Sequence, residues 1–255
     1  VVLGTIGCLI VLGGLGFFVW EDCLEHRSWQ RLSFYSRMVL AVTGALILGG
    51  WLFFLGAEWN NLETLGGMTA GEKVGNALFQ SVTLRTAGYS VLDQGALREG
   101  AAALSVVLML IGGSSGSTAG GIKTVTFLVL VLTIWARARG KSTVCAFKRT
   151  IPDEQTQNAM IIAFIVLALA VFGGIFISAT SPMDFTDAVY EAVSALATVG
   201  LSAGGTASLS IPAQILIIIY MYFGRVGVLT ISLGFLAGNR AEERFRYAET
   251  NLLIG

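Results

Sequence analysis

Thr86-Ala87-Gly88-Tyr89-Ser90 and Thr198-Val199-Gly200-Leu201-Ser202 are two copies of one short pattern, T-x-G-x-S. They are 112 residues apart (198 − 86), and no gap is needed to align the residues around them. Four further pairs are identical at this offset: Leu84 and Leu196, Leu104 and Leu216, Met109 and Met221, Gly112 and Gly224. The chain therefore contains an internal repeat, and we call the two copies the first turn and the second turn.

Composition indicates that the repeat lies in a membrane. The chain has 255 residues, of which 55% are hydrophobic and 13% are charged, whereas about 25% of a soluble domain is charged. A membrane-spanning helix needs about 20 apolar residues. Runs of this kind cover residues 1–20, 38–57, 100–135, 158–179 and 211–236. Because residues 1–20 lack a charged leader and begin with Val, they predict an N-terminally truncated chain rather than a signal peptide.

The order of these runs predicts an all-α membrane protein made of repeated helix–pore-loop–helix units. In each unit a spanning helix precedes a helix too short to cross, Glu72–Leu84 or Thr186–Ala197, and the turn follows. We expect two complete units plus the last helix of a preceding one. The expected domains are 1–20 (that last helix), 38–135 (a unit with an intramembrane loop), 158–236 (the last unit) and 237–255 (a cytoplasmic tail).

The basic residues predict the orientation of the chain. Eleven of the 16 Lys and Arg residues lie within 27–37, 137–149 and 240–246, which the positive-inside rule places in the cytoplasm. The opposite connections contain most of the remaining acids: Glu58, Glu63, Glu72, Asp93, Glu99, Asp184, Asp187 and Glu191. These acids form either an acidic outer mouth that concentrates cations or ordinary surface polarity, and the sequence leaves both interpretations open.

The turns have the composition of a cation site. A pore that removes water from an alkali cation must supply oxygen ligands, and main-chain carbonyls do so without net charge. Gly88 and Gly200 permit backbone angles that aim successive carbonyls one way. The C-terminal end of the short helix before each turn also favours a cation. The alternative interpretation is a pair of membrane turns without ligands.

The run at 100–135 is interrupted by Gly112–Gly121, which is too rich in Gly and Ser for a regular helix. A phosphate-binding loop requires Gly-Lys-Ser/Thr, and here Ile122 separates Gly121 from Lys123. We therefore expect either a mobile intramembrane gate or a passive break in the helix.

Arg225 lies at membrane depth, so we expect its charge to face the pathway and contact this loop. For Arg85 a structural role is favoured, through helix carbonyls or an outer acid.

The motifs RTAGYS, GGSSGSTAGGIKT, ATVGLS and YFGRVG resemble the Trk/Ktr/HKT superfamily of potassium transporters, and the bacterial Ktr-type membrane subunit most closely. The resemblance extends over nearly the whole chain. It implies four helix–pore-loop–helix units around one K+ pathway, of which this chain supplies half of the selectivity filter.

Residues in both turns and in the loop take their expected roles from this resemblance. The implied K+ ligands are Thr86, Ala87, Gly88, Tyr89, Thr198, Val199, Gly200 and Leu201. The implied gate consists of Gly112, Gly113, Gly116, Ser117, Thr118, Gly120, Gly121, Lys123 and Arg225.

The expected function is K+ uptake across a bacterial plasma membrane, with a non-conducting scaffold or partner subunit as the alternative. An enzyme is disfavoured, because the chain has one His and no carboxylate pair within an apolar run.

No cofactor is expected. K+ is the transported ion and Na+ a candidate coupling ion, and the sequence does not separate a channel from Na+- or H+-coupled transport. The expected partners are membrane lipid, a second copy in a homodimer, and a cytosolic nucleotide-binding regulatory subunit. No nucleic acid is expected.

Overall fold

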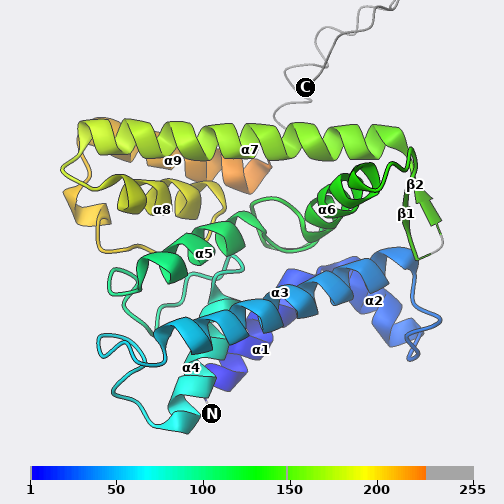
Figure 1. Cartoon of the computed structure of the whole chain (residues 1–255), viewed down its shortest axis with the longest axis horizontal. Helices are drawn as coiled ribbons and strands as arrows, with labels where there is room; N and C mark the ends of the chain where they lie inside the picture. The colour runs from blue at the N-terminus through cyan, green and yellow to red at the C-terminus, as the bar shows by residue number, and fades with distance from the viewer. Residues whose placement is uncertain (1, 148, 228–255) are drawn as a thin grey trace, which may run out of the picture.

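The computed structural model describes residues 2–147 and 149–227, and within them the chain is mostly helical (Figure 1). The helices are α1 (Val2–Leu15), α2 (Phe17–Glu25), α3 (Phe34–Glu58), α4 (Ala70–Thr83), α5 (Glu99–Leu110), α6 (Thr124–Ala138), α7 (Asp153–Thr180), α8 (Phe185–Leu196) and α9 (Ile211–Val226). A 3-10 turn covers Thr206–Ser208. The expected tail at 237–255 and the end of the run at 211–236 lie outside the described residues.

The helical membrane fold expected from the composition is confirmed. Among the described residues, α3 and α7 are long and apolar enough to cross a membrane, whereas α5, α6 and α9 are shorter apolar helices. Ser33 and Ser210 begin α3 and α9 by accepting backbone hydrogen bonds, which satisfies N–H groups that have no partner within the helix. The chain is a multi-pass membrane protein.

The run expected as a single helix over residues 1–20 is broken in the structure. The structure has two helices there, α1 and α2, bent by 95°. The bend lies at Gly16, whose φ of +81° is a conformation that favours glycine. Apolar composition alone did not reveal the break. The bend turns the charged end of α2 away from the direction of α1 and toward the start of α3.

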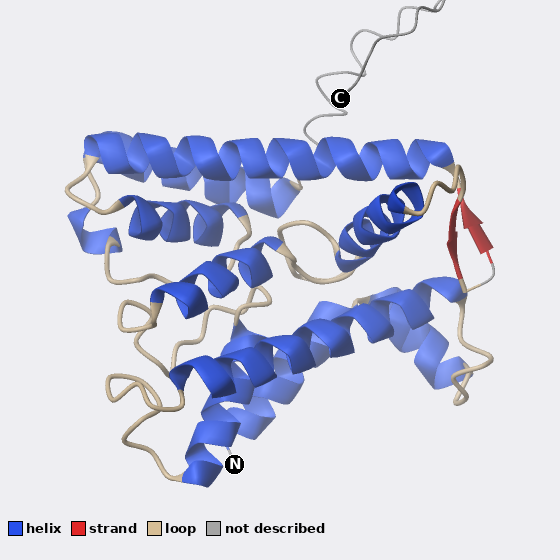
Figure 2. Cartoon of the chain, viewed as in Figure 1, coloured by secondary structure: helices blue, strands red, loops and turns tan. Residues whose placement is uncertain are grey.

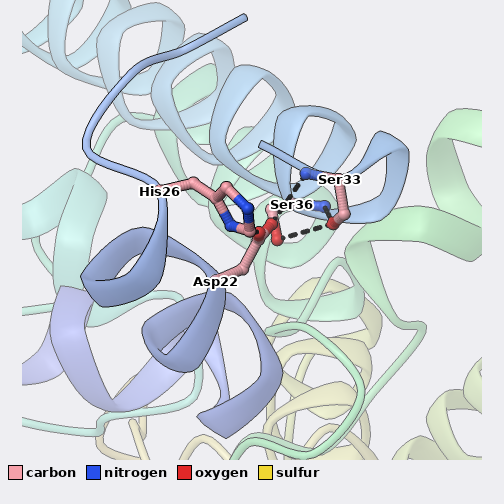
Figure 3. Close-up of polar contacts among 4 residues, drawn as sticks. All are labelled: Asp22, His26, Ser33 and Ser36. Atoms are coloured by element: carbon pink, nitrogen blue, oxygen red, sulfur yellow. Dashed lines mark hydrogen bonds and ion pairs between the residues drawn. The ribbon is translucent and has the colours of Figure 1, made fainter. Parts of the chain in front are cut away.

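A polar cluster fixes the corner between α2 and α3 (Figure 3). Asp22 accepts a hydrogen bond from the backbone N–H of Ser33 at 2.9 Å, and Ser33 in turn accepts one from the N–H of Ser36 at 3.1 Å. His26 lies 3.2 Å from the Asp22 carboxylate. The start of α3 is thus tied to α2 by side chains as well as by the connecting loop.

A small hairpin departs from the all-α expectation. Strands β1 (Val144–Ala146) and β2 (Arg149–Ile151) pair antiparallel, with Val144 opposite Ile151 (Figure 2). Strand β1 alternates between buried and exposed residues, as expected for a half-buried strand, whereas β2 buries only Ile151. Val144, Ala146 and Ile151 pack with Met38 and Val129 in a separate apolar cluster. The hairpin lies at the same end of the molecule as α2 (Figure 1).

The two long helices belong to equivalent runs of elements. We call α3, α4, the first turn and α5 the first repeat, and α7, α8, the second turn and α9 the second repeat. In each repeat the short helix packs against the long one, and α5 of the first repeat also contacts α8 of the second. The main apolar core therefore extends across both repeats, and the two turns are positioned by one shared core.

Candidate cation site

The two turns have the same unusual backbone. Thr86 and Gly88 have φ values of +62° and +77°, and Thr198 and Gly200 have values of +57° and +90°. Only one other non-glycine residue in the described part of the chain, Phe147, has a positive φ. A β-branched residue in this region is strained by about 1–3 kcal/mol and persists only where its surroundings enforce it. The strain at matching positions therefore marks both turns as functional candidates.

Each turn is held by the short helix before it. In the first turn, the Thr83 hydroxyl donates to the Tyr89 carbonyl at 2.6 Å. In the second turn, the Ser194 hydroxyl accepts from the Gly200 N–H at 3.1 Å. The sequence reasoning missed Thr83 and Ser194, although polar residues at the end of an amphipathic membrane segment were a usable signal. The Tyr89 carbonyl, expected among the K+ ligands, already has this hydroxyl as a partner.

The structure brings the two turns into contact. A side chain on Gly88 would collide with the Val199 carbonyl, so the turns approach backbone to backbone. Gly200 instead has no atom within 4 Å of where a side chain would begin, and it is exposed. The two central glycines thus have opposite surroundings, one packed against the other turn and one facing open space.

A cavity of about 290 Å³ connects the first turn with the Gly-rich loop at Gly112–Gly121. It is lined by residues of the first turn and its start, by α1 and by the loop: Arg85, Thr86, Ala87 and Tyr89, then Gly13 and Gly14 among others of α1, and Thr118 and Ala119. No residue of the second turn lines this cavity. Three of the four predicted ligand residues of the first turn, all but Gly88, therefore share one space with Thr118 of the predicted gate.

The Gly-rich loop is more firmly held than its composition suggested. Its ends are joined by backbone hydrogen bonds between Leu110, Gly112 and Ile122. Ser114 is fully buried, and its N–H donates to the Gly14 carbonyl at 3.0 Å while its hydroxyl donates to Leu15. The loop therefore packs against α1, because its missing side chains let its backbone reach that helix directly.

Three basic side chains donate to carbonyls of this loop. Arg225 donates to Thr118 at 2.7 Å, which confirms the expected contact between this arginine and the loop. Lys123 donates to Ala119. Arg85 donates to Gly112 at 3.0 Å and to Thr43 of α3 at 3.4 Å. Neither contact expected for Arg85, its own helix end or an outer acid, is present, because its guanidinium points toward the loop.

Two of the outer acids do not face solvent. Glu58 is fully buried, and its carboxylate accepts from Asn61, Thr64 and the N–H of Arg98 at 2.7–3.0 Å. Glu191 is 5% exposed and accepts from the hydroxyls of Ser202 and Thr206. These two carboxylates anchor the outer loops, so they are not part of an acidic outer mouth.

Comparisons with known proteins agree with this architecture. A family model described as TrkH, cation transport protein, matches residues 1–243. The chain is 38% identical to the potassium/sodium uptake protein NtpJ of Enterococcus hirae, over 98% of the chain and 56% of that protein. It is 35% and 34% identical to the Ktr system potassium uptake protein B of Vibrio alginolyticus and of Bacillus subtilis, covering 55% of each.

A solved structure shows the same fold. The potassium transporter TrkH from Vibrio parahaemolyticus superimposes with a TM-score of 0.68 over 90% of this chain and 50% of that one, at 19% identity. The chain spans about half the length of the curated relatives it matches.

Proposed function

The chain belongs to the TrkH family of cation transport proteins, and from this membership we propose that it forms part of a K+ uptake pathway across a bacterial plasma membrane. The relatives named above are potassium or potassium/sodium uptake proteins, which favours transport over catalysis. In this proposal the two turns are two segments of a selectivity filter, and the Gly-rich loop is the gate beneath them.

The observation that carries the proposal is the shared backbone of the turns. Positive φ at the first and third residues, with Ala87 and Val199 outside this region, alternates the handedness of successive residues. Such alternation turns neighbouring carbonyls toward the same side, where they can replace the hydration shell of K+. The C-terminal ends of α4 and α8 lie immediately before the turns and add partial negative charge.

Two hydrogen bonds to residues that line the cavity support the proposed gate. Thr118 and Ala119 line the cavity below the first turn, and Arg225 and Lys123 donate to these two residues. A guanidinium held at this depth repels a cation that enters without a neutralising partner. We propose that transport requires the loop, with Arg225, to move away from the cavity.

The coupling ion and the partners are proposals of the same kind. Na+ is the candidate coupling ion, in line with the potassium/sodium designation of the Enterococcus relative. A homodimer and a cytosolic nucleotide-binding regulatory subunit follow from the sequence resemblance. Dependence of K+ uptake on external Na+, measured at constant membrane potential, tests the first of these.

Uptake of ⁸⁶Rb+ tests the function itself. The protein that contains this chain is expressed in cells that lack their own K+ uptake systems, and initial rates are measured after K+ starvation. We expect saturable uptake that external K+ inhibits more strongly than Na+. Deleting residues 114–117 is expected to raise the rate. A correctly inserted protein without ⁸⁶Rb+ uptake would instead support a non-conducting scaffold.

A further inference from the structure

Three polar side chains form a buried cluster behind the first turn. Gln80 lies in α4, Gln94 lies in the loop after the turn, and Tyr190 lies in α8 of the second repeat. Their exposed fractions are 1%, 3% and 1%. None of them lines the cavity next to the first turn.

The cluster is closed by hydrogen bonds. Gln80 and Gln94 form a reciprocal amide pair, with N···O distances of 2.6 Å and 3.2 Å. Gln94 also donates to the Leu92 carbonyl at 2.7 Å. The Tyr190 hydroxyl donates to the same Gln94 oxygen at 3.0 Å. Buried amides without partners are strongly unfavourable, so each of these contacts depends on the others.

The hydrogen bond from Tyr190 crosses between the repeats. It joins the helix that precedes the second turn to the loop that follows the first turn, 96 residues away. The turns also touch directly where Gly88 meets the Val199 carbonyl. Gln94 thus adds a side-chain link between the two repeats to the direct backbone contact of the turns.

The second repeat has no equivalent link. At the 112-residue offset, Gln80 corresponds to Ala192 and Gln94 to Thr206. Thr206 donates to Glu191 at 2.9 Å, within its own repeat. The cross-repeat contact is therefore specific to the first turn.

We propose that Gln80, Gln94 and Tyr190 are positioning residues that set the spacing between the two turns and thereby the preference for K+ over Na+. The inference rests on the proposed function. The space that carbonyls leave for a dehydrated ion depends on the distance between the backbones that carry them. If the Tyr190 bond is lost, the first turn is free to move relative to the second, and the smaller ion is less well excluded.

The test compares Tyr190→Phe with Tyr220→Phe in the complete protein. Both tyrosines are almost fully buried and donate one hydrogen bond, but Tyr220 donates to Leu169 of α7, at 2.7 Å, within the second repeat. Inhibition of ⁸⁶Rb+ uptake by K+ and by Na+ gives the selectivity ratio. We expect Tyr190→Phe to lower this ratio about three- to tenfold, as for loss of one net hydrogen bond, and Tyr220→Phe to leave it unchanged.

Two further variants separate positioning from general destabilisation. Gln94→Leu is expected to lower the ratio at least as much as Tyr190→Phe, and the double variant to add little beyond Gln94→Leu. Wild-type selectivity in Tyr190→Phe, or an equal change in Tyr220→Phe, would overturn the inference and leave the proposed function standing. Absence of uptake by the wild-type protein would remove the proposed function and this inference with it.

Discussion

The first and second repeats have the same turn but hold it differently. In both, Thr and Gly have positive φ at the first and third positions. In the first repeat the loop after the turn is fixed by a neutral amide pair that reaches the other repeat, whereas in the second a buried carboxylate fixes it locally. What the repeats share is therefore the direction of the main chain, and this favours carbonyl oxygens over side chains as the ion ligands.

The repeats also differ below the turns. Gly112 corresponds to Gly224 and Gly113 to Arg225 at the 112-residue offset. In the first repeat α5 ends at Leu110 and the Gly-rich loop follows. In the second repeat α9 remains helical past the corresponding position and ends at Val226. One repeat thus supplies the proposed gate and the other supplies the arginine that contacts it, so the repeats are complementary and not interchangeable.

The largest difference in ⁸⁶Rb+ uptake is expected between variants of the two central glycines, Gly88 and Gly200. Alanine at either position adopts a positive φ at a cost of about 1–2 kcal/mol, but only Gly88→Ala must also displace the Val199 carbonyl. We expect Gly88→Ala to reduce ⁸⁶Rb+ uptake by about 100-fold or more, and Gly200→Ala by about tenfold or less, since 1.4 kcal/mol corresponds to a factor of 10. Rates are normalised to protein in the membrane. Equal losses in both variants would contradict the difference in surroundings.

The complementarity of the repeats predicts a gain of flux on removal of Arg225. Arg225→Ala removes the charge and the 2.7 Å contact with Thr118, so leak of ⁸⁶Rb+ is expected to rise about tenfold with little change in the K+ to Na+ ratio. Arg225→Lys keeps the charge and serves as the control. If Arg225→Ala retained wild-type gating, a role for this arginine at the gate would be excluded.

Replacing the buried carboxylate of Glu191 in the second repeat is expected to lower the stability of the protein. Glu191→Gln weakens the contacts with Ser202 and Thr206, which costs about 1–3 kcal/mol at a buried site. The thermal unfolding midpoint in detergent is expected to fall by several degrees. Glu63→Gln, on the exposed outer loop, is the control and is expected to have no effect. A larger effect in the control would contradict the anchoring role of Glu191.

The smallest effect on stability is expected from the acidic residues at the starts of α4 and α8. Glu72 accepts from the backbone N–H and the hydroxyl of Thr69 at 2.9 Å and 2.8 Å, and these bonds, the backbone one first, lower the pKa of its carboxyl. A lowered folded pKa stabilises the protein above the unfolded value of about 4.3, and this stabilisation is lost as the pH falls through the folded pKa.

Glu72→Gln is therefore expected to lower the thermal unfolding midpoint by less than about 2 °C at pH 7. The difference in midpoint from wild type is expected to shrink below about pH 4. Asp184→Asn is the control at the start of α8, where Asp184 makes no capping hydrogen bond with its side chain. A difference that grew on acidification would show that Glu72 is not held in its charged form.

The helices and the two turns could be predicted from the sequence because length, apolarity and the repeat determine them. Thr86 and Thr198 were expected to contribute oxygens, but their positive φ was not, since threonine disfavours this region and only the surrounding fold enforces it. The bend at Gly16 was missed because hydropathy does not distinguish a straight helix from a broken one. The hairpin at 144–151 was missed because three-residue strands give almost no periodic signal.

The contacts of polar side chains were the least predictable part of the site. Arg225 and the loop were expected to meet because a charge at membrane depth needs a partner. For Arg85 the same reasoning left several carbonyls possible, and its partners, Thr43 and Gly112, lie 42 and 27 residues away in sequence. Contacts of this range depend on how the helices pack, which a single sequence does not specify.

The most direct measurement is the position of the ion. Crystals of the complete protein grown in Rb+ and measured at the Rb absorption edge would locate bound ions by anomalous scattering. We expect a peak between the first and second turns, within coordination distance of main-chain oxygens of Thr86, Gly88, Thr198 or Gly200. A peak held by side-chain carboxylates elsewhere, with none between the turns, would contradict the assignment of these two segments to the ion pathway.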